Sequence, residues 1–133
     1  MKVIHVSGKR KRAIARATIK PGKGTVRINR MLLDNIQPRL SRMRIREPIL
    51  LAGDIVKKMS ISVSVIGGGI TSQADAARLA IARAIVQFSN DKKLETTYLD
   101  YDRQLLVADV RRKEVSKPNR HGKARAKRQK SYR

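Results

Sequence analysis

The segment Gly67-Gly68-Gly69, followed by Ile70-Thr71-Ser72, is the first place where residue types and spacing could do chemistry. Glycine-rich turns that lead from a strand into a helix present backbone N–H groups that bind phosphate oxygens. The spacing does not form a dinucleotide-binding fingerprint, because the last glycine of that pattern would stand at Ser72. Three glycines also permit a tight turn and close backbone packing. Both interpretations, a phosphate contact and a packing role, stay open, whereas a nucleotide-dependent enzyme is strongly disfavoured.

A second glycine-rich segment, Gly22-Lys23-Gly24-Thr25, resembles a fragment of a P-loop. A complete P-loop needs an earlier glycine, a lysine directly followed by Ser or Thr, and then a helix. Here position 17 is Ala, Gly24 separates Lys23 from Thr25, and a strand is expected to follow. We therefore predict a turn at this segment rather than a nucleotide site.

Few side chains suited to acid–base or metal chemistry occur in the chain, which contains two histidines and no cysteine. His5 lies among apolar residues of an expected strand, where a structural role is favoured. His121 lies among lysines and arginines, which disfavour its protonation. Asp100 and Asp102 stand beside Arg103, and we expect structural ion pairs there or an arginine held in place for RNA. We predict no catalytic residue, no cofactor and no metal site.

The overall charge points to a polyanionic partner. The 133 residues include 32 Lys plus Arg against 10 Asp plus Glu, for a formal net charge of +22. Such an excess disfavours folding alone and favours binding to nucleic acid. One Phe, three Tyr and no Trp leave little for stacking exposed bases on aromatic side chains. The length predicts one domain, and no apolar run matches a membrane span or a signal peptide.

The positive charge is concentrated at the two ends of the chain. Residues 1–33 hold ten basic side chains and no acidic one, and residues 111–133 hold eleven basic side chains with only Glu114 acidic. Residues 34–110 are close to ordinary balance. We predict a globular α+β RNA-binding domain at 1–110. An extended basic C-terminal tail follows at 111–133, disordered alone and ordered on nucleic acid.

The apolar periodicity predicts four strands. They are expected at residues 3–6, 13–19, 24–28 and 59–66, and the segment MSISVSVI at 59–66 shows the clearest alternation. We expect the second and third strands to pair through the turn at 20–23. The fourth resembles an aggregation-prone segment unless it is central and covered.

Helical pieces are expected at 31–36 and 47–51, with Pro48 near the first turn of the second piece. The arginines at 39, 42, 44 and 46 are expected to lie on an irregular segment. The strongest helix follows the glycine triplet, with Ser72 as N-cap and Asp75 three residues on. Its apolar face, formed by residues 77, 81, 84, 85 and 88, predicts close packing of an alanine-rich helix on a sheet. A further helix is expected at 91–99, and the segment 101–110 rejoins the body, so the elements favour a small α+β sandwich.

Several motifs, in order along nearly the whole chain, resemble the universal small-subunit ribosomal protein nine family. They are Gly8-Lys9-Arg10-Lys11-Arg12-Ala13, Ala15-Arg16-Ala17, Ile19-Lys20-Pro21-Gly22-Lys23-Gly24, Gly67-Gly68-Gly69-Ile70-Thr71-Ser72-Gln73, Ala76-Ala77-Arg78, Ala82-Arg83-Ala84-Ile85 and the ending from Lys123 to Arg133. The glycine segment is the most specific of them. The segment at 101–109 and the ending at 129–133 are similar to the archaeal and eukaryotic branch, and the short N-terminus favours the archaeal form.

The resemblance implies a two-layer α+β sandwich of a small mixed sheet with helices on one side, as in domain two of small-subunit ribosomal protein five. It implies a structural constituent of the small ribosomal subunit in the cytoplasm. The partners implied are 16S-type rRNA in the 3′ major domain of the subunit head, neighbouring head proteins and peptidyl-site tRNA. The tail would reach that tRNA through Arg128, Lys130 and Arg133, and no membrane contact is implied.

Basic residues and the glycine triplet are the expected rRNA contacts, through phosphates rather than base edges. Arg10, Arg12, Arg16 and Arg44 are the arginines most suited to bidentate phosphate contacts. The full set of expected rRNA-binding residues is Lys9, Arg10, Lys11, Arg12, Arg16, Arg44, Gly67, Gly68, Gly69, Arg111, Arg112, Lys113, Arg120, Lys123 and Arg125.

Three other functions remain as alternatives. Composition by itself is also typical of a DNA-compacting protein or a general nucleic-acid chaperone, which would bind any duplex similarly. A phosphate-ester enzyme that uses the glycine triplet would turn over nucleotides, and the residues strongly disfavour it. A membrane-surface role is disfavoured because no segment pairs a basic face with large apolar anchors.

Overall fold

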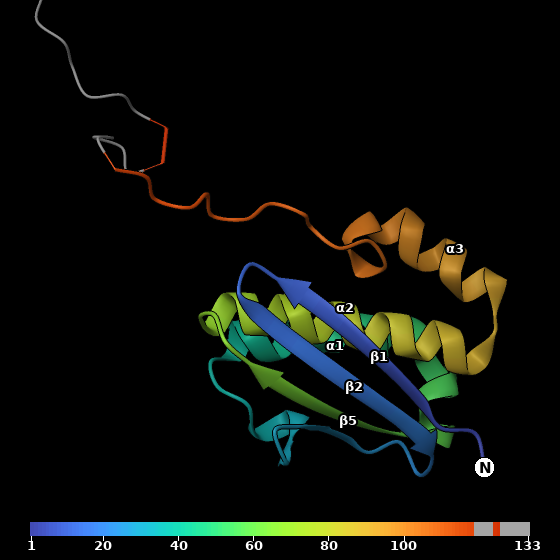
Figure 1. Ribbon diagram of the computed structural model, residues 1–133. Coiled ribbons are helices and arrows are strands. Elements are labelled where there is room, and N and C mark those ends of the chain that lie inside the picture. Colours follow the sequence, from blue (N-terminus) through green and yellow to red (C-terminus); the bar gives the residue numbers. More distant parts are fainter. Residues whose placement is uncertain (119–123, 126–133) are drawn as a thin grey trace, which may run out of the picture.

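The computed structural model describes residues 1–118 and 124–125 of the chain. The predictions for His121, Arg120, Lys123, Arg128, Lys130 and Arg133 therefore lie outside the described residues. A five-stranded mixed sheet and three α-helices make up the body (Figure 1). No α-helix in the described part of the chain has the length and apolar character needed to cross a membrane.

The sheet has the strand order β1-β2-β5-β3-β4. Its strands are β1 (Ile4–Arg10), β2 (Ala13–Pro21), β3 (Val26–Ile28), β4 (Met31–Leu32) and β5 (Met59–Ile66). All neighbours are antiparallel except β3 and β5, which pair in parallel. The sheet is therefore mixed, with β5 at its centre.

Helices cover one face of this sheet. They are α1 (Arg39–Ala52), α2 (Ile70–Ser89) and α3 (Lys92–Tyr101), with short 3-10 helices at Leu33–Asn35, Gly53–Lys58 and Arg103–Leu105. The helix α2 packs on β1, β2 and β5, and α1 packs against α2 (Figure 1). The predicted α+β class, with a mixed sheet and helices on one side, is confirmed.

Small residues bring α2 close to the sheet. A Cβ atom at Gly8 of β1 would lie 2.6 Å from the carbonyl oxygen of Ala76 and 2.8 Å from the backbone nitrogen of Ala80. Ala76, Ala77, Ala80 and Ala84 are all fully buried. The expected alanine-rich contact is therefore confirmed, and no larger side chain fits between β1 and α2.

Two predictions about the strands were wrong. The first strand does not end at Ser7 but continues through Gly8 to Arg10, because antiparallel pairing with β2 satisfies its backbone over the whole length. The residues around 24–28 do not pair with β2, because β5 occupies that position and β3 pairs with β5 instead. The side chain of Asn29 strengthens this pairing, since it exchanges hydrogen bonds with the backbone of Val65. By contrast, β5 itself has the predicted bounds.

The helix predictions also need correction. The arginine segment is not irregular, since α1 runs from Arg39 to Ala52 with Pro48 in its interior. Burial of Ile45, Pro48 and Ala52 along one side holds this helix together across the proline. The segment expected to be helical at 31–36 contains β4 and then a 3-10 helix.

The start of α2 differs from the prediction, whereas the later helix agrees with it. Gly69, not Ser72, is the N-cap of α2, and no side chain caps this end. The side chain of Asp91 caps α3, which spans Lys92–Tyr101. The buried hydroxyl of Tyr98 donates to the carbonyl of Pro48 at 2.6 Å, which ties α3 to α1. Burial raises the pKa of the Tyr98 hydroxyl, so it remains a donor.

Candidate nucleic-acid interface

A basic groove of about 580 Å³ lies where three segments of the chain meet. These segments are the turn between β1 and β2, the glycine turn before α2 and the first residues after position 110. Six of the nine lining residues are cationic and none is acidic. The lining residues are Arg10, Lys11, Arg12, Gly68, Gly69, Ser72, Arg111, Arg112 and Lys113.

The β1–β2 hairpin positions two of these cations. Arg10 pairs with Ala13, so Lys11 and Arg12 form a two-residue turn. Lys11 has a φ of 53°, the left-handed conformation that such tight hairpin turns require. Both side chains are exposed at the tip of the hairpin. The turn therefore presents adjacent positive charges beyond the end of the sheet.

The first two glycines of the triplet serve close backbone packing. Gly67 and Gly68 have φ values of 76° and 67°. A Cβ at Gly67 would lie 2.6 Å from the carbonyl oxygen of Arg12, and a Cβ at Gly68 would lie 2.9 Å from the backbone nitrogen of Ala13. The glycine turn therefore lies directly against the β1–β2 hairpin. This contact places the start of α2 close to Lys11 and Arg12 at the hairpin tip.

Gly69 differs from its two neighbours. It has no positive φ, and a Cβ there would meet no atom within 4 Å. The protein itself therefore gives no steric reason for a glycine at this position. The first N–H groups of α2 also lack a side-chain cap, so they remain available to an acceptor from outside. Between the two interpretations of the triplet, packing explains Gly67 and Gly68, whereas Gly69 fits an approaching anion.

Asp109 holds the third segment in place. Its Oδ2 atom lies 2.9 Å from Nη1 of Arg10, an ionic contact outside hydrogen-bond geometry. The same carboxylate accepts hydrogen bonds from the Arg111 side chain, with the Nη2 atom at 2.7 Å. These bonds, with the nearby charge of Arg10, hold the pKa of Asp109 well below its usual range. The chain therefore leaves the body beside the hairpin tip, with Arg112 and Lys113 exposed.

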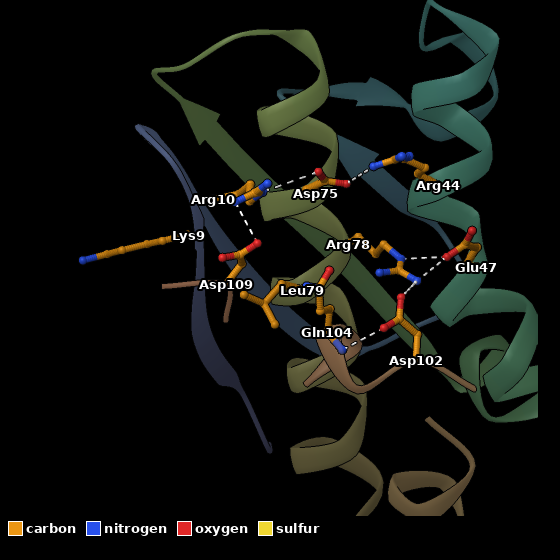
Figure 2. A pocket seen from close by; sticks show the side chains of 10 residues that line it. All are labelled: Lys9, Arg10, Arg44, Glu47, Asp75, Arg78, Leu79, Asp102, Gln104 and Asp109. Carbon is orange, nitrogen blue, oxygen red and sulfur yellow. Dashed lines mark hydrogen bonds and ion pairs between the residues drawn. The ribbon is translucent and has the colours of Figure 1, made fainter. Parts of the chain in front are cut away.

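A second pocket, of about 300 Å³, adjoins the basic groove and shares Arg10 with it. We call it the ionic pocket. Figure 2 shows three arginines that face four carboxylates in the ionic pocket. The residues that line this pocket are Lys9, Arg10, Arg44, Glu47, Asp75, Arg78, Leu79, Asp102, Gln104 and Asp109.

Ion pairs connect the elements around the ionic pocket. Arg78 of α2 donates to Glu47 of α1 and also to Asp102, the residue that follows α3, at 2.7 Å and 3.0 Å (Figure 2). Arg44 donates to Asp75 at 2.6 Å. The Arg78 side chain is only 12% exposed. Carboxylates of the protein itself therefore neutralise the positive charges of the arginines in this pocket. The ion pair of Asp102 agrees with the structural role predicted for it.

The structure distributes the expected rRNA-binding residues over several places. Lys11, Arg12, Gly68, Gly69, Arg111, Arg112 and Lys113 line the basic groove, and Arg10 lines both pockets. Gly67 does not line the groove but packs against the backbone of the β1–β2 hairpin at Arg12. Arg44 lies in the ionic pocket. Lys9 and Arg16 lie on the outer face of the sheet; Lys9 also borders the ionic pocket, but its side chain is directed away from the ion pairs there (Figure 2). Arg125 pairs with Glu114.

Sequence reasoning missed two features of the charged surface. Ser72 lines the groove, although the capping pattern assigned it to the helix end. Lys20 and Arg27 lie on the same exposed side of the sheet as Arg16, and the strand alternation could have placed them there. His5 is exposed on the same face, and its Nδ1 atom lies 3.0 Å from the Thr18 hydroxyl. Within residues 1–118 and 124–125, no three His, Asp or Glu side chains gather as a metal site would require.

Comparison with known proteins now identifies the family. The model of the family described as ribosomal protein S9/S16 matches residues 8–133. The chain is 49% identical over 134 residues to the small ribosomal subunit protein uS9 of Methanococcus maripaludis strain C7, with both chains covered in full. It is 51% identical over 133 residues to uS9 of Methanothrix thermoacetophila, again over the whole of both chains. These archaeal relatives confirm the predicted branch, and the chain belongs to the ribosomal protein S9/S16 family, as a structural ribosomal protein rather than an enzyme.

Proposed function

We propose that this protein is a structural constituent of the small ribosomal subunit that binds rRNA phosphates in the basic groove. The observation that carries the proposal is the composition of that groove, whose lining has six cations and no carboxylate. The family and the names of the relatives, small ribosomal subunit protein uS9, support the same assignment. The ribosome then places the protein in the cytoplasm.

The groove suits a sugar–phosphate backbone. Lys11 and Arg12 supply charge from the hairpin, while the uncapped N–H groups of α2 supply hydrogen-bond donors beside Gly69. Arginine binds phosphate with two parallel hydrogen bonds, which fixes orientation as well as charge. Structured RNA is recognised largely by backbone and shape, so a protein with few aromatic side chains is suited to it. The groove therefore positions the body on rRNA without reading sequence.

We further propose the division into a body at 1–110 and an rRNA-bound tail at 111–133. Residues 111–118 are exposed, without helix or strand, and carry four cations against Glu114. The contact of Asp109 with Arg10 and Arg111 directs the chain outward beside the groove. The resemblance supports a place in the 3′ major domain of the head, beside neighbouring head proteins. It also supports a contact of Arg128, Lys130 and Arg133 with peptidyl-site tRNA.

Reconstitution of small subunits with a groove variant tests the proposal. The variant carries Lys11→Ala and Arg12→Ala, and its matched control carries Lys92→Ala and Lys93→Ala, which remove the same charge from exposed positions of α3. We expect the groove variant to dissociate from the subunit at lower salt than the control. Equal retention of both variants would contradict rRNA binding in the groove. Equal affinity of the wild-type chain for rRNA and for unrelated duplexes would favour the nucleic-acid chaperone instead.

The tail is tested separately by truncation. Removal of residues 128–133 is expected to weaken binding of peptidyl-site tRNA while the subunit still assembles. Loss of assembly with unchanged tRNA affinity would contradict this division of roles.

A further inference from the structure

We propose that the outer face of the sheet, opposite the helices, is a second rRNA-binding surface that lies flat against a sugar–phosphate backbone. This inference rests on the proposed function and extends it from the groove to a separate face of the molecule. The surface carries His5, Ser7, Lys9, Ile14, Arg16, Thr18, Lys20, Arg27, Leu32, Ser60, Ser62, Ser64 and Ile66.

The strand register places these side chains in rows across the sheet. One row runs from His5 through Thr18 and Ser62 to Arg27, and a second joins Ser7, Arg16 and Ser64. The alternate residues of the strands point to the other face and are buried beneath the helices, as are Met59, Ile61, Val63 and Val65 of β5. The helix α2 packs on the sheet from that other face, and α1 and α3 pack against α2, so the described helices leave the outer face uncovered (Figure 1).

The cations of this face have no counter-charge within the sheet. No strand contains an acidic residue, whereas the strands carry Lys9, Arg16, Lys20 and Arg27 on this side. Cross-strand neighbours of these cations are neutral: Arg16 faces Ser64, Lys20 faces Ser60 and Arg27 faces Ser62. An acidic residue at any of these cross-strand positions would have stabilised the sheet by pairing with the cation. No ion pair among the described residues involves any of these four cations, so their charge is directed at an external anion.

The centre of the face is built from small hydroxyl side chains. Ser60, Ser62 and Ser64 alternate along the central strand β5, and Thr18 lies beside Ser62 on β2. Short side chains let a partner approach the sheet closely, and each hydroxyl both donates and accepts hydrogen bonds. Phosphate oxygens and ribose 2′-hydroxyls need such partners.

A protein partner fits this face less well. Its only large aliphatic side chains, Ile14, Ile66 and Leu32, lie at its margins, and it has no Phe, Tyr or Trp. Interfaces between proteins concentrate aromatic and apolar side chains at their centre, whereas here the centre is serine and the surroundings are cationic. Uncompensated positive charge with a hydroxyl centre selects a nucleic-acid backbone.

The face continues away from the basic groove. Lys9 lies at the groove end of the sheet, while Lys20 lies at the other end of β2, eight residues after Arg12. At a rise of about 3.3 Å per residue, the contact would extend about 25 Å beyond the hairpin turn. The two surfaces together would hold the body on rRNA from two sides of the hairpin.

Crosslinking within the assembled subunit tests this inference. A photoreactive diazirine amino acid is placed at position 62 of the full chain, at position 12 in the groove, and at position 93 on α3. After reconstitution and irradiation, we expect rRNA crosslinks from positions 62 and 12. A crosslink from position 62 to a protein, or none while position 12 crosslinks to rRNA, would overturn the inference and leave the proposed function intact. Failure of the wild-type chain to enter small subunits would instead overturn the proposed function.

Neutralising the outer face provides a second measurement. Arg16→Ala with Arg27→Ala removes two exposed cations, and Lys92→Ala with Lys93→Ala is again the control of equal charge. We expect affinity for rRNA to fall on the order of tenfold relative to the control, while the urea unfolding midpoint stays unchanged. An affinity equal to that of the control would overturn the proposal.

Discussion

The basic groove and the ionic pocket are neighbours that share Arg10, yet they use arginine in opposite ways. In the ionic pocket, Arg10, Arg44 and Arg78 face four carboxylates. The groove is lined by six cations and no acidic residue; Arg10 and Arg111 pair with Asp109 at its edge, whereas Lys11, Arg12, Arg112 and Lys113 make no ion pair among the described residues. The positions of the acidic residues therefore separate the two surfaces more clearly than the positions of the basic ones. An arginine in this family member is directed at RNA where the protein places no carboxylate beside it.

The comparison has an energetic side. When one partner of a half-buried arginine–carboxylate pair is removed, the charge of the other partner remains uncompensated in a poorly solvated place. An exposed cation among other cations is solvated, and its removal relieves repulsion. Substitutions in the ionic pocket should therefore act on folding, and substitutions in the groove should act on RNA binding.

The largest effect is expected for Arg78→Met in the ionic pocket. The substitution leaves Glu47 and Asp102 facing each other without their shared partner. We expect the free energy of unfolding to fall by about 3 kcal/mol. Arg12→Met in the groove is the matched control, with an expected change within about 0.5 kcal/mol. Urea unfolding of the two variants checks this, and similar losses of stability in both would break the comparison.

Substitutions in the glycine triplet should also separate an effect on folding, at Gly67, from an effect on rRNA binding, at Gly69. Gly67→Ala introduces a Cβ that would lie 2.6 Å from the carbonyl oxygen of Arg12, at a φ of 76°. We expect a loss of about 2 kcal/mol in unfolding free energy. Gly69→Ala should cost less stability, because its Cβ would meet no atom of the protein and only the preference for glycine over alanine at the N-cap is lost. It should weaken rRNA binding, because the Cβ would narrow the approach of an external anion to the start of α2. If Gly69→Ala left rRNA binding unchanged, the anion contact would be excluded.

The salt dependence of rRNA binding should separate an arginine of the groove from one of the ionic pocket. If the whole chain engages about ten phosphates, the slope of log K against log salt is roughly −7 to −9. Arg12→Ala should make that slope less steep by about 0.7 to 0.9. Arg44→Ala should change it less, because Arg44 already pairs with Asp75 at 2.6 Å. Equal changes in the two slopes would mean that Arg44 also contacts phosphate.

The smallest effect is expected from Asp109, where the two regions meet. Hydrogen bonds from Arg111 and the charge of Arg10 hold its pKa below the ordinary 3.8. A lowered folded-state pKa contributes stability that is fully present above about pH 4 and is lost as pH falls through the folded-state value. Unfolding at a series of acidic pH values should therefore show a weaker pH dependence in Asp109→Asn. An unchanged dependence would show that Asp109 does not hold the segment at 109–112.

Much of this architecture was predictable from local pattern. The alternation in Met59–Ile66 located β5 with its exact bounds. The apolar residues Ala77, Ile81 and Ile85 are buried in α2 as predicted, although the closest contact of α2 with β1 is made at Ala76 and Ala80. The prediction that β3 pairs with β2 was based on their proximity along the chain. It failed because strand pairing depends on the packing of the whole chain, which places β5 between them. The prediction for α1 failed because its stability across Pro48 comes from burial against α2, which the segment alone does not show.

The sequence by itself determined the basic charge, its concentration at the two ends, the family and the elements with strong periodicity, since none of these requires knowing which distant residues meet in space. Only the tertiary structure decided which arginines meet carboxylates. Arg78 of α2 reaches Glu47 of α1, and Asp109 reaches Arg10 of β1, across separations of 31 and 99 residues. Electrostatic compensation depends on distance in space, so these pairings, and the faces left without them, follow from the packing of strands and helices.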